Sequence, residues 1–193
     1  MNAIDSITKF VLAHSFVEKR TKEECYKFLK QIKDSCYEQI LREYYLKKYY
    51  KGNIDNRINF VCDKFANYKS AFTKLFYRTC TLDFGVPIAC KKYNLEHNNN
   101  SIERYNGKIK DRIKSIRSGF KSFEGARCFM DLRRVINNFV NPHQELNEKT
   151  PAEVADINLD LGRNKLLKLI ELVAKLRWWY FYSILFLIML LLG

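Results

Sequence analysis

The sequence lacks the close cysteine pairs that zinc sites and compact disulfide frameworks use. Its six cysteines form no Cys-x-x-Cys pair, and no His-x-x-x-His motif lies near them. This spacing argues against a zinc site, so we expect free, buried thiols in a reducing cytoplasm. A signal peptide is also absent from the start of the chain, which favours a cytoplasmic protein. The cysteines are Cys25, Cys36, Cys62, Cys80, Cys90 and Cys128.

Acidic residues are also few relative to basic ones. The chain has 34 Lys and Arg residues against 21 Asp and Glu residues, which gives a net charge of +13. This excess favours a polyanionic partner, with nucleic acid first and an anionic membrane surface second. The 193 residues suggest one domain with an appendage, and a hydrophobic fraction of 47% argues against disorder of the whole chain.

A basic helix is predicted from Asn100 to Arg117. Asparagines at its start suit helix capping, and apolar residues follow at helical spacing. The predicted buried stripe consists of Ile102, Ile109, Ile113, Ile116 and Phe120. Glu103 lies beside this stripe and heads a row of cations on the same line of the helix: Lys110, Lys114, Arg117 and Lys121.

Two interpretations of this helix stay open. A carboxylate above a basic face suits phosphodiester chemistry, because cations hold phosphates while the acid coordinates a metal. Alternatively, Glu103 completes a near capping box with Asn100 and has only a structural role. The candidate DNA-binding residues are Arg104, Lys108, Lys110, Arg112, Lys114, Arg117 and Lys121.

The first part of the chain has an alternation of strands and helices. We expect a strand over Thr8–Val17, a long helix from the Thr21–Glu24 capping box to Lys51, and a buried strand Ile58–Cys62. This order predicts a parallel pair of strands joined by the helix. Asp63 would then lie at the carboxyl end of a strand, where ligand sites of α/β sheets occur; as a lone residue it also suits a turn or helix cap.

Further along the chain, local signals predict short elements. We expect a helix from Asn67 to Phe76 and an irregular strand within Thr79–Ala89. Ser122 is the predicted cap of a later helix whose end precedes Pro142, and Thr150 with Pro151 predicts the start of a short helix.

Several motifs resemble the catalytic domain of insertion-sequence DDE transposases, members of the RNase H-like integrase superfamily. The later motifs are His97–Arg104, Arg117–Ser122, Asn138–His143 and Leu146–Glu153; the earlier ones are Asp5–Phe10, with Arg20–Thr21 after it, and Phe65–Phe72. The resemblance implies an α/β fold with an RNase H-like core. It also implies that Asp63 and Glu103 match the second and third catalytic acids, which hold Mg²⁺ in the intact family.

The first catalytic aspartate of that family has no counterpart in this sequence. The resemblance places Asp5 at a turn and not at the catalytic position. We therefore expect a truncated, catalytically inactive protein that binds DNA, either alone or together with an intact transposase.

The last residues differ in character from the rest. Trp178 to Leu192 contains no charged residue, while Lys175 and Arg177 precede it. This pattern predicts a hydrophobic tail over residues 169–193, a possible transmembrane segment that follows a transposase-like domain over residues 1–168. A membrane-tethered basic protein without a DNA role is therefore the alternative function, and DNA binding that weakens with salt would separate the two.

Overall fold

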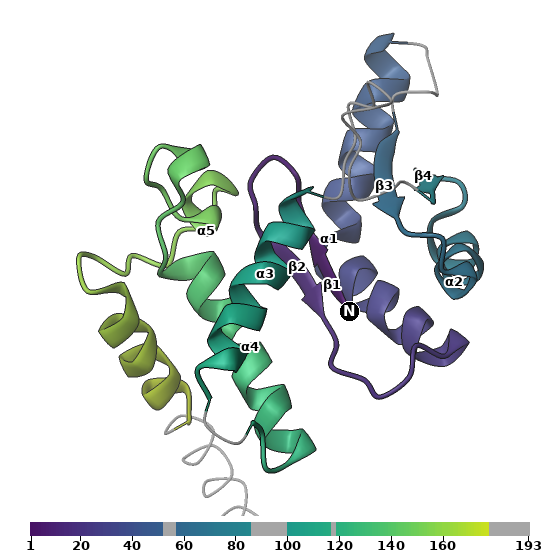
Figure 1. Cartoon of the computed structure of the whole chain (residues 1–193). Coiled ribbons are helices and arrows are strands. Elements are labelled where there is room, and N and C mark those ends of the chain that lie inside the picture. Colours follow the sequence, from purple (N-terminus) through teal and green to yellow (C-terminus); the bar gives the residue numbers. More distant parts are fainter. Residues whose placement is uncertain (52–56, 86–99, 117–118, 178–193) are drawn as a thin grey trace, which may run out of the picture. The chain divides into compact units, whose positions relative to one another are not determined.

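The computed structural model describes residues 1–51, 57–85, 100–116 and 119–177 (Figure 1). It mixes helices with small sheets, which agrees with the expected α/β class. The chain divides into two compact units, Met1–Arg134 and Val135–Gly193. The apolar run from Trp178 to Leu192 lies outside the described residues. None of the helices in the described ranges is long and apolar enough to cross a membrane.

The first unit is built from a β-hairpin, a long helix, a β-α-β unit and two further helices, the last of which runs across the boundary between the units. In chain order these are β1 (Asn2–Ile4), β2 (Val11–His14), α1 (Lys22–Lys51), β3 (Ile58–Cys62), α2 (Ala66–Phe76), β4 (Cys80–Phe84), α3 (Asn100–Lys114) and α4 (Phe123–Phe139).

Strands β1 and β2 form an antiparallel hairpin. The turn expected at Asp5–Phe10 joins them, and the Asp5 carboxylate accepts hydrogen bonds from the amide of Thr8 at 2.7 Å and from its hydroxyl at 2.6 Å. The expected strand Thr8–Val17 is therefore too long, because its first residues belong to this turn. A bulge lies where Ile4 pairs with Val11 while Ala3 pairs with Ala13.

The hairpin contributes to two separate hydrophobic cores. Ala3 and Ala13 pack in the first core, where β2 contacts α1. Ile4 and Val11 pack in the second core, against α3 and α4. The bulge breaks the strict alternation of side chains, so Val11 and Ala13, two residues apart, serve different cores.

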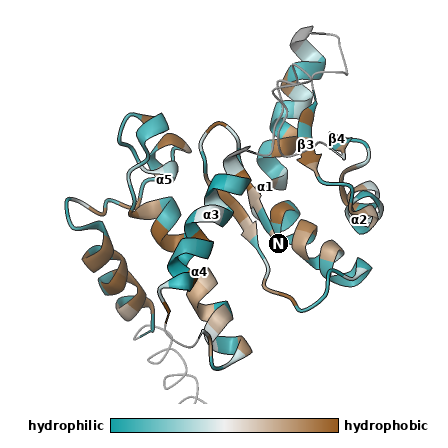
Figure 2. Ribbon diagram, viewed as in Figure 1, coloured by the Kyte–Doolittle hydropathy of each residue, from teal (hydrophilic) through white to brown (hydrophobic). Residues whose placement is uncertain are grey.

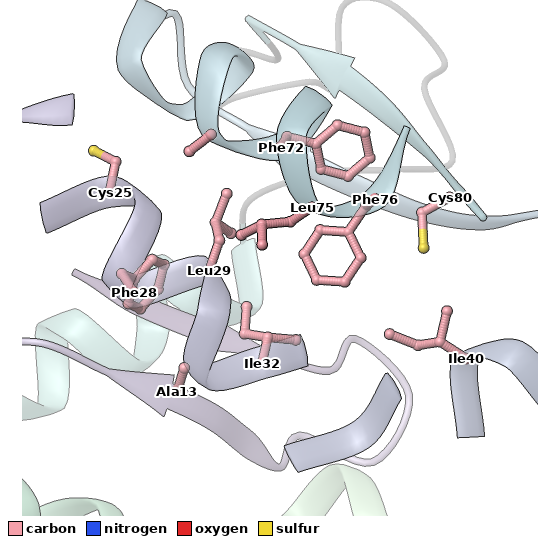
Figure 3. Close-up of a cluster of buried hydrophobic side chains, with 11 residues drawn as sticks. Ala13, Cys25, Phe28, Leu29, Ile32, Ile40, Phe72, Leu75, Phe76 and Cys80 are labelled. Atoms are coloured by element: carbon pink, nitrogen blue, oxygen red, sulfur yellow. The ribbon is translucent and has the colours of Figure 1, made fainter. Parts of the chain in front are cut away.

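Helix α1 covers the first core, and its start and end agree with the expected cap at Thr21 and the Lys51 boundary, although the Thr21 amide donates to the Lys19 carbonyl, so only half of the expected capping box forms. The Thr21 hydroxyl accepts from the amide of Glu24 at 3.2 Å. A kink at Cys36 was not predicted: its φ is −138°, and its thiol donates to the Ile32 carbonyl at 3.0 Å. Side-chain bonds to the preceding turn weaken the regular backbone ladder there. Figure 3 shows how Leu29 and Ile32 point toward Phe76 of α2.

The parallel pair of strands differs from the expected one. Strand β3 pairs with β4, not with β2, and α2 is the crossover helix between them. Strand β2 pairs with β1 instead, so the long helix α1 connects two separate sheets. The described strands form two separate two-stranded sheets, and the RNase H-like core stays a prediction.

The thiols of the described cysteines are free, as expected. Cys25 and Cys80 are buried in the first core, and burial raises the pKa of the Cys80 thiol. Cys128 is exposed, contrary to the expectation of burial, because it lies on the outer side of α4. Cys90 lies outside the described residues.

The second unit starts inside α4. It contains the 3-10 helix η3 (Gln144–Leu146), α5 (Pro151–Val154) and a helix over residues 165–177. The expected start at Thr150 is confirmed: the Thr150 hydroxyl accepts from the Glu153 amide, Glu153 accepts from the Thr150 amide, and Pro151 occupies the first turn. Lys165 also binds Glu153 at 2.7 Å, and these bonds lower the pKa of Glu153 to about 2.

Replacing Gly107 by alanine should stabilise the protein. Gly107 lies in the middle of α3, and a Cβ atom there would have nothing within 4 Å. Because glycine destabilises a helix interior relative to alanine, we expect Gly107→Ala to raise the free energy of unfolding by roughly 0.5–1 kcal/mol. Chemical denaturation followed by circular dichroism measures this change.

Gly85→Ala is the matched control. Gly85 has a φ of +86°, and a Cβ atom there would lie 2.9 Å from Cγ of Lys64. An alanine is strained in this backbone conformation, so the free energy of unfolding should fall. A destabilised Gly107→Ala variant would contradict the open helical position of Gly107.

Candidate nucleic-acid interface

Helix α3 carries the predicted basic face. Its start at Asn100 and the place of Glu103 in its first turn are as expected. Tyr105 and Ile109 are both 5% exposed and pack in the second core with Val11 and Met130. Because these side chains fix one face of the helix against the hairpin, the opposite face points to solvent.

Five of the seven candidate DNA-binding residues lie on α3. All five are exposed or partly exposed: Arg104, Lys108, Lys110, Arg112 and Lys114. At 100° per residue, Lys110 and Lys114 lie within about 20° of Glu103, while Arg104 and Lys108 lie roughly 100–140° further round the helix and Arg112 about 180° from Glu103. Figure 2 shows the hydrophilic colouring of this helix. We name these five residues the α3 cations.

The last two candidates do not extend this face. Helix α3 ends at Lys114, where we expected it to reach Arg117, and Arg117 lies outside the described residues. The amides of Ser115 and Ile116 bond to carbonyls three residues back, and Gly119 has a φ of +65°. Bonds of this three-residue type tighten the last turn of a helix, and Gly119 lies five residues beyond Lys114. Lys121 therefore lies beyond the helix, on the approach to α4, and not on the predicted row.

A polar network joins α3 to the hairpin. Nδ2 of the Asn2 side chain donates to Oδ1 of Asn106 at 2.8 Å, and Nδ1 of His14 lies 2.8 Å from Oδ1 of Asn2. Nζ of Lys9 donates to the Ser101 hydroxyl at 3.0 Å. The bonds to α3 connect residues about a hundred positions apart in the chain. They fix the rotation and the position of α3, and so the direction of its cations.

His14 is the buried end of this network. It is 6% exposed, and burial is the main cause that lowers its pKa to about 4; the Met1 amino group and Arg134 lower it further, while Asp131 opposes them. Since Oδ1 of Asn2 accepts, Nδ1 of the neutral ring carries the hydrogen. Sequence reasoning missed His14, because its partners are distant in the chain.

Asp63 lies directly after β3, as expected, but its partner is a cation. Nη1 of Arg20 lies 3.2 Å from Oδ2 of Asp63, and the Phe65 amide donates to Oδ1 at 3.1 Å. The Arg20 guanidinium also lies 4.3 Å from the centre of the Phe65 ring. Asp63 therefore starts the turn into α2 and balances the charge of Arg20. Both side chains are about half exposed.

The structure places Asp63 and Glu103 on elements that belong to different cores. Phe60 of β3 and Phe65 next to Asp63 pack on the first core, whereas α3 packs in the second. Within the described ranges, no group of three or more His, Cys, Asp or Glu side chains could hold a metal ion. The residues that the structure describes therefore do not complete a three-acid Mg²⁺ site, and a metal shared by Asp63 and Glu103 stays a prediction.

Comparisons with protein-family models, with curated proteins and with solved structures gave no match. The interpretation of the α3 face therefore depends on its own geometry and on the motifs in the sequence.

Replacing His14 by asparagine should flatten the pH dependence of stability. As pH falls from about 6.5 to about 4, the unfolded state takes up a proton on His14 that the folded state does not, so folding stability decreases. Between pH 7 and pH 4, the free energy of unfolding of His14→Asn should fall by on the order of 2 kcal/mol less than that of the native chain. Asparagine keeps a donor for Asn2, so the network is preserved.

Urea denaturation of both proteins between pH 7 and pH 4, at intervals of about half a pH unit, measures the effect. Carboxylates titrate in both proteins, so their contribution cancels in the difference. Two parallel pH profiles would show that His14 is not held neutral.

Proposed function

We propose that this chain is a DNA-binding protein derived from an insertion-sequence DDE transposase and that it does not catalyse strand transfer. The observation that carries the DNA-binding part is the set of five exposed α3 cations on a helix that the hairpin holds in place. The transposase origin depends on the motif resemblance.

The charge distribution of α3 favours phosphate contacts. Five cations stand against Glu103 and Asp111 on the same helix, and Lys114 pairs with Asp111 at 3.4 Å with both side chains largely exposed. Such an exposed pair contributes little and is readily exchanged for a phosphate. Lysine and arginine contacts to phosphates release counterions from DNA, which makes this binding independent of base sequence and sensitive to salt.

The lack of catalysis is inferred from the motif resemblance, which matches only two of the three catalytic acids, and the surroundings of Asp63 add support. Two-metal phosphoryl transfer needs carboxylates free to bind Mg²⁺ through oxygen. The Arg20 guanidinium already occupies one side of the Asp63 carboxylate and repels a second cation. The protein would then act as a non-catalytic competitor or partner of an intact transposase on DNA.

A second candidate function is attachment of this basic protein to a membrane surface. The helix over residues 165–177 carries exposed apolar side chains, and Figure 2 shows its hydrophobic colouring. They are Leu166, Leu167, Ile170, Val173 and Leu176. Amphipathic helices with such a face lie in the interface of anionic bilayers.

Removing the charge of α3 should weaken binding to duplex DNA of any sequence. In the fourfold variant Lys108→Ala, Lys110→Ala, Arg112→Ala, Lys114→Ala, we expect a lower affinity. The plot of log affinity against log salt should also become shallower, by roughly 0.9 for each phosphate that the variant no longer neutralises. Fluorescence anisotropy with two unrelated duplexes, over a range of salt concentrations, measures both effects.

The control removes four exposed cations elsewhere: Arg42, Lys48, Arg163 and Lys175. It has the same net charge as the α3 variant and should keep most of the affinity. An equal loss in both variants would show that total charge, not α3, determines binding. Failure of the native chain to bind duplex DNA, together with binding to anionic vesicles, would favour the membrane alternative.

The purified chain should neither cut nor join DNA strands with Mg²⁺ or Mn²⁺. The assay compares the native chain, Glu103→Ala and Arg20→Ala on terminal-repeat DNA, with products resolved on denaturing gels. We expect no product from any of the three, because Arg20→Ala frees Asp63 without supplying a third acid. Cleavage by the native chain that Glu103→Ala abolishes would refute the inactive assignment.

A further inference from the structure

A groove of about 480 Å³ lies between α1 and α2, apart from the α3 cations. Lysines from both helices line it: Lys22, Lys27 and Lys30 from α1, and Lys74 from α2. We name these four the groove lysines. Tyr26 and Ser70 also line the groove and add an aromatic ring and a hydroxyl group.

Packing of the two helices fixes the shape of this groove. Leu29 of α1 and Leu75 of α2 are buried in the first core, and Figure 3 shows them between the two helices. Residues 22, 26 and 30 recur every four positions and therefore share one face of α1. Ala71, also buried, contributes only a methyl group to the wall, which leaves the space open.

The groove is cationic. Of its lysines, Lys27 pairs with Glu24 at 2.9 Å. Within the described part of the chain, the other three have no carboxylate within ion-pair distance, and Glu23 is the one acid in the wall. The α1 lysines extend over roughly 12 Å, from residue 22 to residue 30. In a duplex, the phosphates of one strand follow one another every ~3.4 Å along the axis. The span of the α1 lysines is therefore long enough to contact more than one phosphate.

The Tyr26 ring adds a contact that charge alone does not provide. It is 38% exposed, and no other ring among the described residues contacts it. An exposed aromatic ring among lysines is the combination with which proteins bind unpaired bases and their phosphates. A base that is paired inside a duplex cannot reach a ring in a groove, whereas an unpaired base can.

We propose that this groove binds single-stranded nucleic acid, with one base stacked on Tyr26 and the neighbouring phosphates held by the groove lysines. Ser70 is placed to donate a hydrogen bond to the strand. This site is distinct from the α3 face, and the proposal does not depend on duplex binding there.

The charge test uses oligo-dT and oligo-rU of about 12 nucleotides and the full chain, followed by fluorescence anisotropy. We expect Lys30→Ala with Lys74→Ala to lower the affinity about tenfold at low salt and to make the salt dependence shallower by roughly 1.4. The matched control, Arg42→Ala with Lys48→Ala, removes two exposed cations of α1 outside the groove and should bind like the native chain. Equal losses in the two variants would overturn the proposal. Comparing the two oligonucleotides tells whether DNA or RNA binds more tightly.

The ring test separates stacking from charge. Tyr26→Leu should weaken binding roughly 5- to 150-fold, the range that stacking of one base supplies, while Tyr26→Phe should keep it. Circular dichroism of each variant checks that the fold is intact. Undiminished binding by Tyr26→Leu, with inorganic polyphosphate competing as well as the oligonucleotides, would show a site for anions in general and would overturn the proposal. The proposal would also be overturned if the groove variants no longer bound phosphatidylserine vesicles but still bound the oligonucleotides.

The α3 variants keep the two binding sites distinguishable. If the groove variants bind oligonucleotides normally while the fourfold α3 variant loses duplex DNA, the groove proposal fails alone. If the groove variants lose affinity only for single strands and the α3 variant loses affinity only for duplexes, both sites are supported.

Discussion

Burial of the β1–β2 hairpin against helices is the constraint on which the first unit depends. A two-stranded hairpin is marginally stable in water by itself, so it needs partners on its faces. Here Ala13 packs on α1 in the first core, and Val11 packs with residues of α3 and α4 in the second core, each at 1% exposure or less. The bulge between them lets one short strand serve both cores. Helices α1 and α3 contact the hairpin directly, and α2, β3 and β4 pack on the far side through α1.

The same hairpin determines what the protein presents to solvent. Asn2 binds Asn106 of α3 and is itself held by His14, while apolar burial of Tyr105 holds the adjacent face. Together they turn the α3 cations outward. On the first core, the contact of α1 with α2 leaves the lysine-lined groove at the surface. The packing of the core therefore determines which helix faces, and so which cations, lie at the two basic surfaces.

Asp63 illustrates the difference between a matching position and a matching environment. It follows a strand, as an acid of the DDE transposases does, and the motif after it is similar. Its carboxylate nevertheless faces Arg20, 43 positions earlier in the chain, and caps the turn into α2. The Arg20–Asp63 ion pair contributes only modestly to stability, because both side chains are about half exposed to solvent. A catalytic role requires that partner to be exchanged for a metal.

The sequence by itself determined the elements whose signals are local. The capping residues Thr21, Ser122 and Thr150 and the proline Pro151 fixed the starts of α1, α4 and α5, since these signals act within one helical turn. Tertiary structure alone decided that β3 pairs with β4 and not with β2, that Arg20 binds Asp63 and that Asn2 binds Asn106 of α3. These outcomes depend on partners far apart in the chain, and no short-range pattern encodes which distant groups will meet.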